Sequence, residues 1–345
     1  MISRQSLSKD WIMRIRKTSQ IPTDPILIEK MILALALLEN LNISGLDFVF
    51  KGGTCMLLLL GKLRRFSIDI DIVVETAQGF DEAIQIILEQ GVFHRCEEDI
   101  RSSNVPKSHY KFFYYSVIEE MERYILMDVL FEKNPYPEYK EVSVESELII
   151  IAGIPIYIKC PSPDCLLGDK LTAFAPHTTG ILYGKGKDLE IIKQLYNIGT
   201  LFDVASNISL VGKTFNTVIN KELTYRGQNS LSPTDVLSDI LNTAYVIGMQ
   251  GFGSKDEFSE LKGGITKLSG YVYLEHFTLD SAILCAAKSA YIATLILNGA
   301  QEISRFNPGI DLSRLLIMDV RYNKLNKVKK TSPEAFYYFY CATMG

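Results

Sequence analysis

A short segment between residues 48 and 75 constrains the fold of this chain more than any other stretch. It begins with an apolar strand, Phe48 to Phe50, passes through Gly52-Gly53-Thr54, and enters an apolar run over Cys55 to Leu60 that is long enough for a helix. Glycine lets the backbone approach a phosphate, and the free amides at a helix start favour negative charge. The segment therefore predicts an anion-binding turn between a strand and a helix.

Two aspartates follow on the next expected strand. Side chains two apart on a strand point to the same face, so Asp69 and Asp71 project together while Ile70 faces the other way. Unit charges about 4 Å apart at an effective dielectric near 20 repel by roughly 4 kcal/mol, so such a pair requires a cation. Carboxylate oxygens suit Mg²⁺, which combines one or two of them with a substrate's phosphates. The alternatives are a plain tight turn and an edge strand with one solvated face, and the order of the two motifs favours the nucleotide site.

In this order the two motifs resemble those of the nucleotidyltransferase superfamily that includes DNA polymerase beta. The fuller string, from Lys51-Gly52-Gly53-Thr54 to Arg65-Phe66-Ser67-Ile68-Asp69-Ile70-Asp71, is similar to the AbiEii/AbiGii (MenT-like) toxins of type IV toxin–antitoxin and phage-abortive systems. The resemblance implies an α+β fold, in which a polymerase-beta-like core of a mixed sheet with helices precedes an α-helical bundle. It also implies transfer of a nucleoside monophosphate from an NTP to the 3′ end of tRNA or another RNA, with a cognate antitoxin as partner.

The resemblance gives roles to the side chains of this segment. Asp69 and Asp71 are expected to be catalytic and to hold Mg²⁺. The triphosphate is expected to bind the backbone amides and hydroxyl of the turn, with help from nearby bases. The expected nucleotide-binding residues of the segment are Lys51, Gly52, Gly53, Thr54, Arg65 and Ser67.

A third acidic residue, Asp128, lies inside an apolar strand expected over Tyr124 to Phe131. A charge in such a strand is costly unless it is paired or bound to a metal. Superfamily members often carry a third acid on a neighbouring strand, so the resemblance implies a catalytic, metal-binding role for Asp128. The alternative is an aspartate paired with Lys111 or Arg123. Two more strands are expected, over residues 111–117 and 154–158.

A helix expected over Cys165 to Phe174 carries the next candidate, Lys170. The residues before it, 161–164, contain two prolines, a serine and an aspartate that can begin a helix. The resemblance implies that Lys170 meets the triphosphate. The alternative is a solvated lysine.

The following helix, expected over residues 187–198, resembles the family's Lys-Gln-x-Tyr-Asp helix but has Asn197 where an aspartate is expected. Either Asp188 takes the catalytic role or the acid is absent. Asparagine can orient a water or a ribose hydroxyl but cannot act as a base. Lys193 and Asn197 are the expected nucleotide contacts of this helix.

The composition is that of a soluble globular protein, with 345 residues, 47% hydrophobic and 22% charged. This length favours two domains, expected over residues 1–160 and 161–345. The apolar windows over residues 31–38 and 56–60 are too short to span a bilayer, and the first ten residues lack a secretory signal. We therefore expect a cytoplasmic protein without a membrane segment. The six scattered cysteines are expected to be free thiols.

The formal net charge is −4, so contact with RNA requires a local basic patch. One basic run is present near the C-terminus, and it contains Arg321, Lys324, Lys327, Lys329 and Lys330. It is either a solvated surface or a contact for the RNA backbone. Two other functions remain open from the sequence: transfer to a small molecule, as in aminoglycoside nucleotidyltransferases, and a non-catalytic regulatory protein that keeps the fold.

Overall fold

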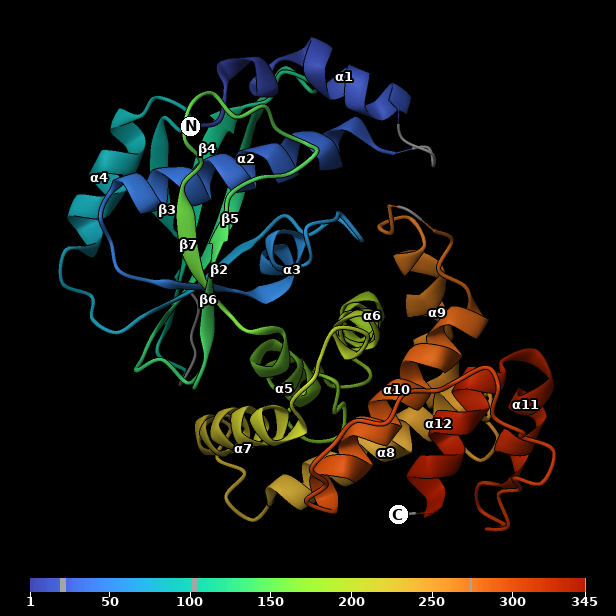
Figure 1. Ribbon diagram of the computed structural model, residues 1–345. Helices are drawn as coiled ribbons and strands as arrows, with labels where there is room; N and C mark the ends of the chain where they lie inside the picture. Colours follow the sequence, from blue (N-terminus) through green and yellow to red (C-terminus); the bar gives the residue numbers. More distant parts are fainter. Residues whose placement is uncertain (19–22, 101–104, 274, 345) are drawn as a thin grey trace. The chain divides into compact units, whose positions relative to one another are not determined.

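The structure is a computed structural model that describes residues 1–18, 23–100, 105–273 and 275–344. It divides into two compact units, one of Met1–Ser162 with Tyr271–Glu275 and one of Pro163–Gly270 with His276–Gly345. The first unit contains a mixed sheet with helices, and the described part of the second is helical (Figure 1). The predicted fold class, an α+β core followed by a helical bundle, is confirmed.

The first unit is built on a five-stranded sheet in the order β1-β2-β5-β4-β3. β2 and β5 are parallel, and the other neighbouring pairs are antiparallel. A separate antiparallel hairpin joins β6 and β7. The strands are β1 (Val49–Lys51), β2 (Ile70–Val74), β3 (Arg95–Glu98), β4 (Lys107–Tyr115), β5 (Glu122–Phe131), β6 (Tyr139–Ser143) and β7 (Tyr157–Pro161). The helices of this unit are η1 (Arg4–Leu7), α1 (Lys9–Thr18), α2 (Pro25–Ile43), α3 (Gly52–Leu60) and α4 (Phe80–Glu89).

The long helix α2 packs against β2 and β5 and is buried along most of its length. Its start is capped, because the Asp24 side chain accepts a hydrogen bond from the Ile26 amide (2.9 Å) and Pro25 occupies the first turn. Ile70 and Ile72 of β2 are fully buried, so one face of the sheet is apolar. Asp71 projects from the other face.

Two predicted strands have other bounds in the structure, and two further strands were not predicted. β4 begins at Lys107 and ends at Tyr115, earlier than the predicted 111–117, and β7 covers Tyr157–Pro161 rather than 154–158. Ile154 lies in a loop and is 85% exposed, so an apolar residue there does not mark a buried strand. The strands β3 and β6 were not predicted because they are short and rich in charge, a composition typical of strands that pair on one side only.

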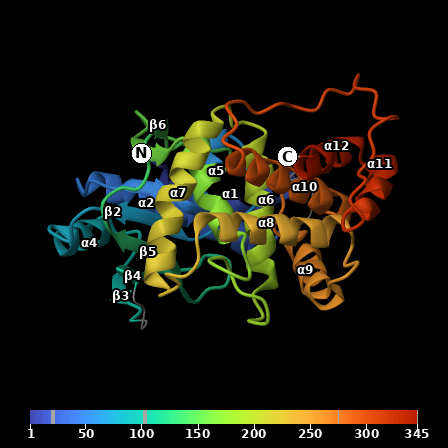
Figure 2. The same ribbon diagram turned by 90° about the horizontal axis from the view of Figure 1, so that it is seen from below.

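The second unit consists of helices packed around α10 (Figure 2). α8 and α10 lie side by side. The elements are α5 (Pro163–Ala173), α6 (Asp188–Phe202), α7 (Ile208–Tyr225), α8 (Pro233–Gly248), α9 (Lys255–Leu268), α10 (Leu279–Leu297), η2 (Asn323–Lys327), α11 (Val328–Thr331) and α12 (Pro333–Met344).

Among the helices that the structure describes, α10 alone is long and apolar enough to cross a membrane by length and composition. No membrane segment was expected from the sequence, and residues 279–297 were not considered as one. In this structure 61% of the apolar window is buried, and a core helix of a helical bundle passes the same test.

Candidate functional site

The turn between β1 and α3 requires glycine at position 52. Gly52 has a φ of +84°, a conformation that other residues adopt with strain. The carboxylate of Asp71 also occupies the space where a Cβ at this position would lie. The glycine therefore allows the turn and brings an acidic side chain against the first residue of α3.

The segment before β2 is held against the same helix start. A Cβ at Gly53 would lie 2.5 Å from Ser67 Oγ and 2.6 Å from Arg65 Nη2, so both side chains approach this backbone. The Thr54 hydroxyl is fully buried and lies 2.9 Å from the Ser67 carbonyl and 2.7 Å from the Asp69 carbonyl, to which it donates. This differs from the expected phosphate contact, because the hydroxyl of Thr54 is already used to fix residues 67–69.

Helix α3 begins at this turn, and the first amides of an α-helix have no acceptor within the helix. It is nine residues long, and its N-cap, Lys51, makes no side-chain capping hydrogen bond. No acidic residue lies in its first turn. Unpaired amides and the positive end of the helix dipole favour an anion at this place.

Four charged or ionisable residues form a row across four strands of the sheet. Lys51 on β1 pairs in register with Asp71 on β2, Asp71 with Asp128 on β5, and Asp128 with His109 on β4. Directly paired residues share a face of the sheet. The row thus runs from the glycine turn across the polar face, and Asp128 belongs to it as its neighbour-strand position predicted.

Asp128 is held by two basic side chains that the sequence analysis did not select. Lys107 Nζ lies 2.5 Å from one carboxylate oxygen, and His109 Nδ1 lies 2.5 Å from the other. Burial opposes ionisation of Asp128, but the charge and hydrogen bonds of Lys107 and His109 outweigh it and lower the pKa of this carboxyl. Lys107 and His109 are two residues apart at the start of β4, as Asp69 and Asp71 are before and in β2. This spacing is the sequence signal that could have selected the two bases as candidates.

The partners that the sequence suggested for Asp128 are engaged elsewhere. Lys111 lies 3.2 Å from Asp99, and Arg123 forms an ion pair with Glu119 four residues before it. Lys111 belongs to the neighbouring strand β4 and Arg123 to β5 itself, and both pair with other carboxylates. Asp128 is therefore paired, but with Lys107 and His109 rather than with Lys111 or Arg123.

Asp69 lies one residue before β2 and is exposed, and Asp71 is partly buried. No group of three or more His, Cys, Asp or Glu side chains that could hold a metal occurs in the described residues. The Asp71 carboxylate lies at the turn, and Asp69, two residues earlier, is placed there by its backbone carbonyl alone. One or two carboxylates suit a magnesium ion that also binds phosphates.

The candidates of the second unit lie on α5 and α6. The Lys170 side chain is 12% exposed, and its Nζ lies 3.6 Å from a carboxylate oxygen of Asp169. Asp188 is the first residue of α6, is 6% exposed and accepts a hydrogen bond from Lys267 Nζ (2.7 Å). It also lies against Gly264 of α9, where a Cβ would meet the Asp188 carbonyl.

Further along α6, Lys193 forms an ion pair with Glu190 at 2.7 Å, and Asn197 is 1% exposed. Lys193 and Asn197 are four residues apart and therefore lie on the same side of the helix. A buried asparagine at this position is an internal hydrogen-bonding group rather than a solvated side chain.

Comparison with known proteins identifies the family to which this chain belongs. The family model described as "Nucleotidyl transferase AbiEii toxin, Type IV TA system" matches residues 36–244, which include every candidate residue above. The chain belongs to the AbiEii toxin family. This AbiEii protein is therefore a nucleotidyltransferase, and the non-catalytic alternative is set aside.

Two crystal structures from Helicobacter pylori are similar to this AbiEii protein. JHP933 is 14% identical, with a TM-score of 0.41 over 87% of this chain and 94% of its own. A candidate nucleotidyltransferase is 15% identical, with a TM-score of 0.46 over 79% of this chain and 96% of its own. No curated protein matches the sequence.

The basic run of the AbiEii protein divides into two groups. Arg321 pairs with Asp319, with Nη2 at 2.6 Å from the carboxylate, and Lys329 donates to the Leu312 and Leu315 carbonyls at 2.9 and 2.5 Å. These two bases have structural partners. Lys324, Lys327 and Lys330 make no ion pair with a carboxylate in the described part of the chain.

Lys324 and Lys327 line a pocket of about 290 Å³ together with Phe252, a 56% exposed ring. The Lys324 ammonium lies 4.8 Å from the centre of that ring. The lining of this pocket contains no acidic residue. An exposed aromatic ring beside uncompensated lysines is the combination that binds single-stranded nucleic acid.

Proposed function

We propose that this AbiEii protein transfers a nucleoside monophosphate from an NTP to RNA, with the 3′ end of tRNA as acceptor. The proposal rests mainly on one observation: the Asp71 carboxylate lies against Gly52. This contact places an acid beside a helix start that suits phosphate. The exposed ring of Phe252 beside Lys324 supports an RNA acceptor. Action in the cytoplasm against phage infection, under control of an antitoxin, belongs to the same proposal.

Mg²⁺ fits the acids of the turn. Asp69 and Asp71 are the residues that would hold it, since one or two carboxylates plus phosphate oxygens are its usual ligands. When bound, the ion neutralises charge on the triphosphate. Ser67, Arg65 and the first amides of α3 would orient the phosphates, and Thr54 would keep residues 67–69 in place for them.

His109, oriented by Asp128, would accept the proton of the attacking hydroxyl. An ionised Asp128 accepts the Nδ1 hydrogen of His109, and in the neutral form of the ring Nε2 is then the acceptor nitrogen. Asp128 would thereby orient His109 as a general base, and Lys107 would keep Asp128 ionised. In this scheme Asp128 acts through His109 rather than as a metal ligand.

The family resemblance assigns further nucleotide contacts to residues of α5 and α6, and these belong to the proposal. Lys170 would neutralise phosphate charge, since its ammonium is fixed beside Asp169 on a helix. Asp188 would contribute an acid at the start of α6, with Lys193 and Asn197 on the same helix for the nucleotide.

A transfer assay with labelled NTPs tests the proposal on total tRNA. Wild-type protein should label the RNA, and Asp71→Asn should lower the rate by roughly 10²- to 10³-fold with folding retained. Asp81→Asn, an exposed aspartate of α4, should leave the rate unchanged. Label on an aminoglycoside and never on RNA would reject the RNA acceptor in favour of a small molecule.

A further inference from the structure

Two aromatic rings lie on the face of the sheet that carries Asp128 and His109. Phe113 of β4 is the register partner of Tyr124 of β5, and the pairing of the two strands runs without a bulge from this pair to His109 and Asp128. Each ring is four residues from its strand's member of that second pair, and residues an even number apart on a strand share a face. The rings therefore continue the polar face beyond the proposed general base.

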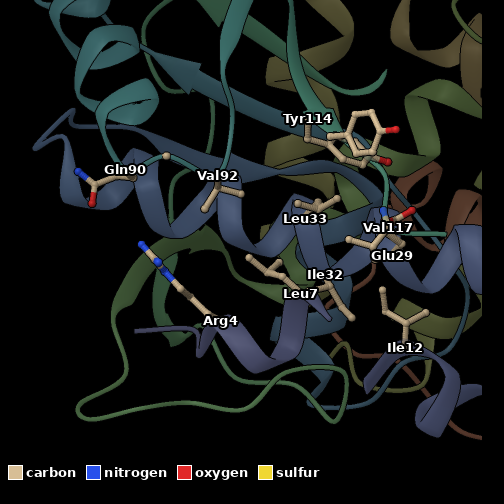
Figure 3. A pocket seen from close by; sticks show the side chains of 12 residues that line it. Arg4, Leu7, Ile12, Glu29, Ile32, Leu33, Gln90, Val92, Tyr114 and Val117 are labelled. Carbon is tan, nitrogen blue, oxygen red and sulfur yellow. The ribbon is translucent and has the colours of Figure 1, made fainter. Parts of the chain in front are cut away.

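The two faces of β4 differ in what covers them. On the other face, Tyr114 is 2% exposed and lines a pocket together with Glu29, Ile32 and Leu33 of α2 (Figure 3). On the polar face, Tyr124 is 45% exposed, and its ring centre lies 5.7 Å from that of Phe113. A large ring that stays open on a sheet face, beside a second ring, is a surface for a flat ligand.

Arg95 of β3 adds a second flat group to this surface. It is the register partner of Phe113, and its guanidinium carbon lies 3.4 Å from the centre of that ring. Its Nε lies 3.1 Å from a carboxylate oxygen of Glu122, and its terminal nitrogens pair with Glu122 and Glu97. The two carboxylates hold the guanidinium plane in place and balance its charge, while the side chain remains 37% exposed.

The charge balance of the surface indicates the kind of ligand. Lys111 Nζ lies 5.4 Å from the centre of the Tyr124 ring, but it also pairs with Asp99 at 3.2 Å. The bases Lys111 and Arg95 are thus both compensated by carboxylates, so a phosphate gains little here. Aromatic faces and guanidinium planes instead stack on unpaired nucleobases, which carry no charge.

We propose that Tyr124, Phe113 and Arg95 form a stacking platform for an unpaired base of the acceptor RNA. This inference rests on the proposed function, since it places the acceptor strand of that reaction. Four residues of an antiparallel strand span about 13 Å, well beyond the roughly 3.4 Å between stacked bases of one nucleic-acid strand. The stacked base therefore belongs to a nucleotide upstream of the one whose hydroxyl reaches His109.

Fluorescence anisotropy of the full-length protein with a labelled single-stranded RNA octamer tests the platform. Tyr124→Leu keeps an apolar side chain beside Phe113 but removes the ring, so the affinity should fall about 5- to 150-fold. The slope of log affinity against log salt should stay the same, because no charge is removed. Arg95→Lys keeps the charge but not the plane, and it should also weaken binding. Thermal unfolding checks that both variants are folded.

Octamers with one abasic nucleotide at successive positions locate the stacked base. Wild-type protein should lose affinity at one internal position, and Tyr124→Leu should show no loss at that position. Two controls change the same residue types elsewhere: Tyr157→Leu on β7, where the tyrosine is 57% exposed, and Arg16→Lys at an exposed arginine of α1. Both should bind the octamers as wild type does.

The binding and transfer assays separate this platform from the proposed function. Equal affinities of Tyr124→Leu and wild type, or a wild-type affinity that no abasic position lowers, would overturn the platform even if RNA is labelled by an NTP. The expected losses of affinity in a protein that never labels RNA would support the platform as an RNA-binding surface and overturn the transfer reaction.

Discussion

The carboxylate of Asp71 fills the position that a Cβ of Gly52 would occupy. The two residues lie on different elements, β2 and the start of α3, and this contact joins the strand of Asp71 to the glycine turn. Any side chain at position 52 must displace the acid.

Gly52→Ala should therefore remove activity and stability together. The alanine meets an unfavourable positive φ and the Asp71 carboxylate, so we expect a loss of about 2–4 kcal/mol in unfolding free energy. Urea unfolding measures this loss, and the labelled-NTP assay should show little transfer. Gly79→Ala is the matched control, because Gly79 also has a positive φ (+77°) but nothing lies within 4 Å of its Cβ position. Equal stability losses in the two variants would contradict the contact.

Lys107→Met should change the acid stability of the protein. The pKa of Asp128 is lowered in the folded state, so its ionisation stabilises the fold above the unfolded pKa of about 3.9. That contribution is lost as the pH falls below this value towards the folded pKa. The difference in unfolding free energy between wild type and variant should accordingly be constant at neutral pH and shrink below about pH 4.

The control for this measurement is Lys159→Met, which breaks a pair with Asp47, a side chain that is 86% exposed. Exposed pairs contribute only about 0–1 kcal/mol, so this variant should stay close to wild type at every pH. A Lys107→Met curve that runs parallel to wild type through the acid range would show that Lys107 does not set the ionisation of Asp128.

Lys170→Ala should weaken NTP binding far more than it lowers stability. The ammonium of Lys170 is paired only at 3.6 Å with Asp169, so its loss removes a charge for phosphate and a weak internal contact. Calorimetry with an NTP should show at least a tenfold weaker affinity, while Lys213→Ala, an exposed lysine of α7, should bind as wild type. Equal affinities in Lys170→Ala and wild type would remove Lys170 from the site.

The joint variant Lys324→Gln, Lys327→Gln, Lys330→Gln should bind RNA less tightly and with weaker salt dependence. Each phosphate contact on a single strand contributes about 0.7 to the slope of log affinity against log salt, so the slope should fall by about 2. Fluorescence anisotropy with a labelled single-stranded RNA measures both quantities. A slope that does not change would show that these lysines are a solvated surface.

A second triple variant controls for net charge, with glutamine at the exposed lysines Lys185, Lys213 and Lys262. It should leave both the affinity and the slope at the wild-type values.

The sequence predicts most of what lies near the glycine turn, because short-range patterns determine it. Asp24-Pro25 marks the start of α2, and the alternation around Asp71 marks its strand and buried face. Each of these signals needs only a few neighbouring residues. The family string over residues 51–71 adds the enzyme class.

Contacts between distant segments are what the sequence alone could not supply. Lys107 and His109 reach Asp128 through the pairing of β4 with β5, and no local pattern states that register. Likewise, the burial of the Thr54 hydroxyl depends on a loop more than ten residues away. Lys170, Asp188 and Asn197 remain predictions, supported by where they lie on their helices.

The row of Lys51, Asp71, Asp128 and His109 also bears on the stage of synthesis at which the toxin can become active. Its four members come from four strands, and the parallel pairing of β2 with β5 joins positions 71 and 128, which are separated by three intervening elements. Pairing of such distant strands is slow relative to local folding. A nascent chain on the ribosome, or a fragment that ends before Glu122, lacks the strand of Asp128 and so carries no assembled row. Under the proposed mechanism, transfer activity must therefore await synthesis beyond that point.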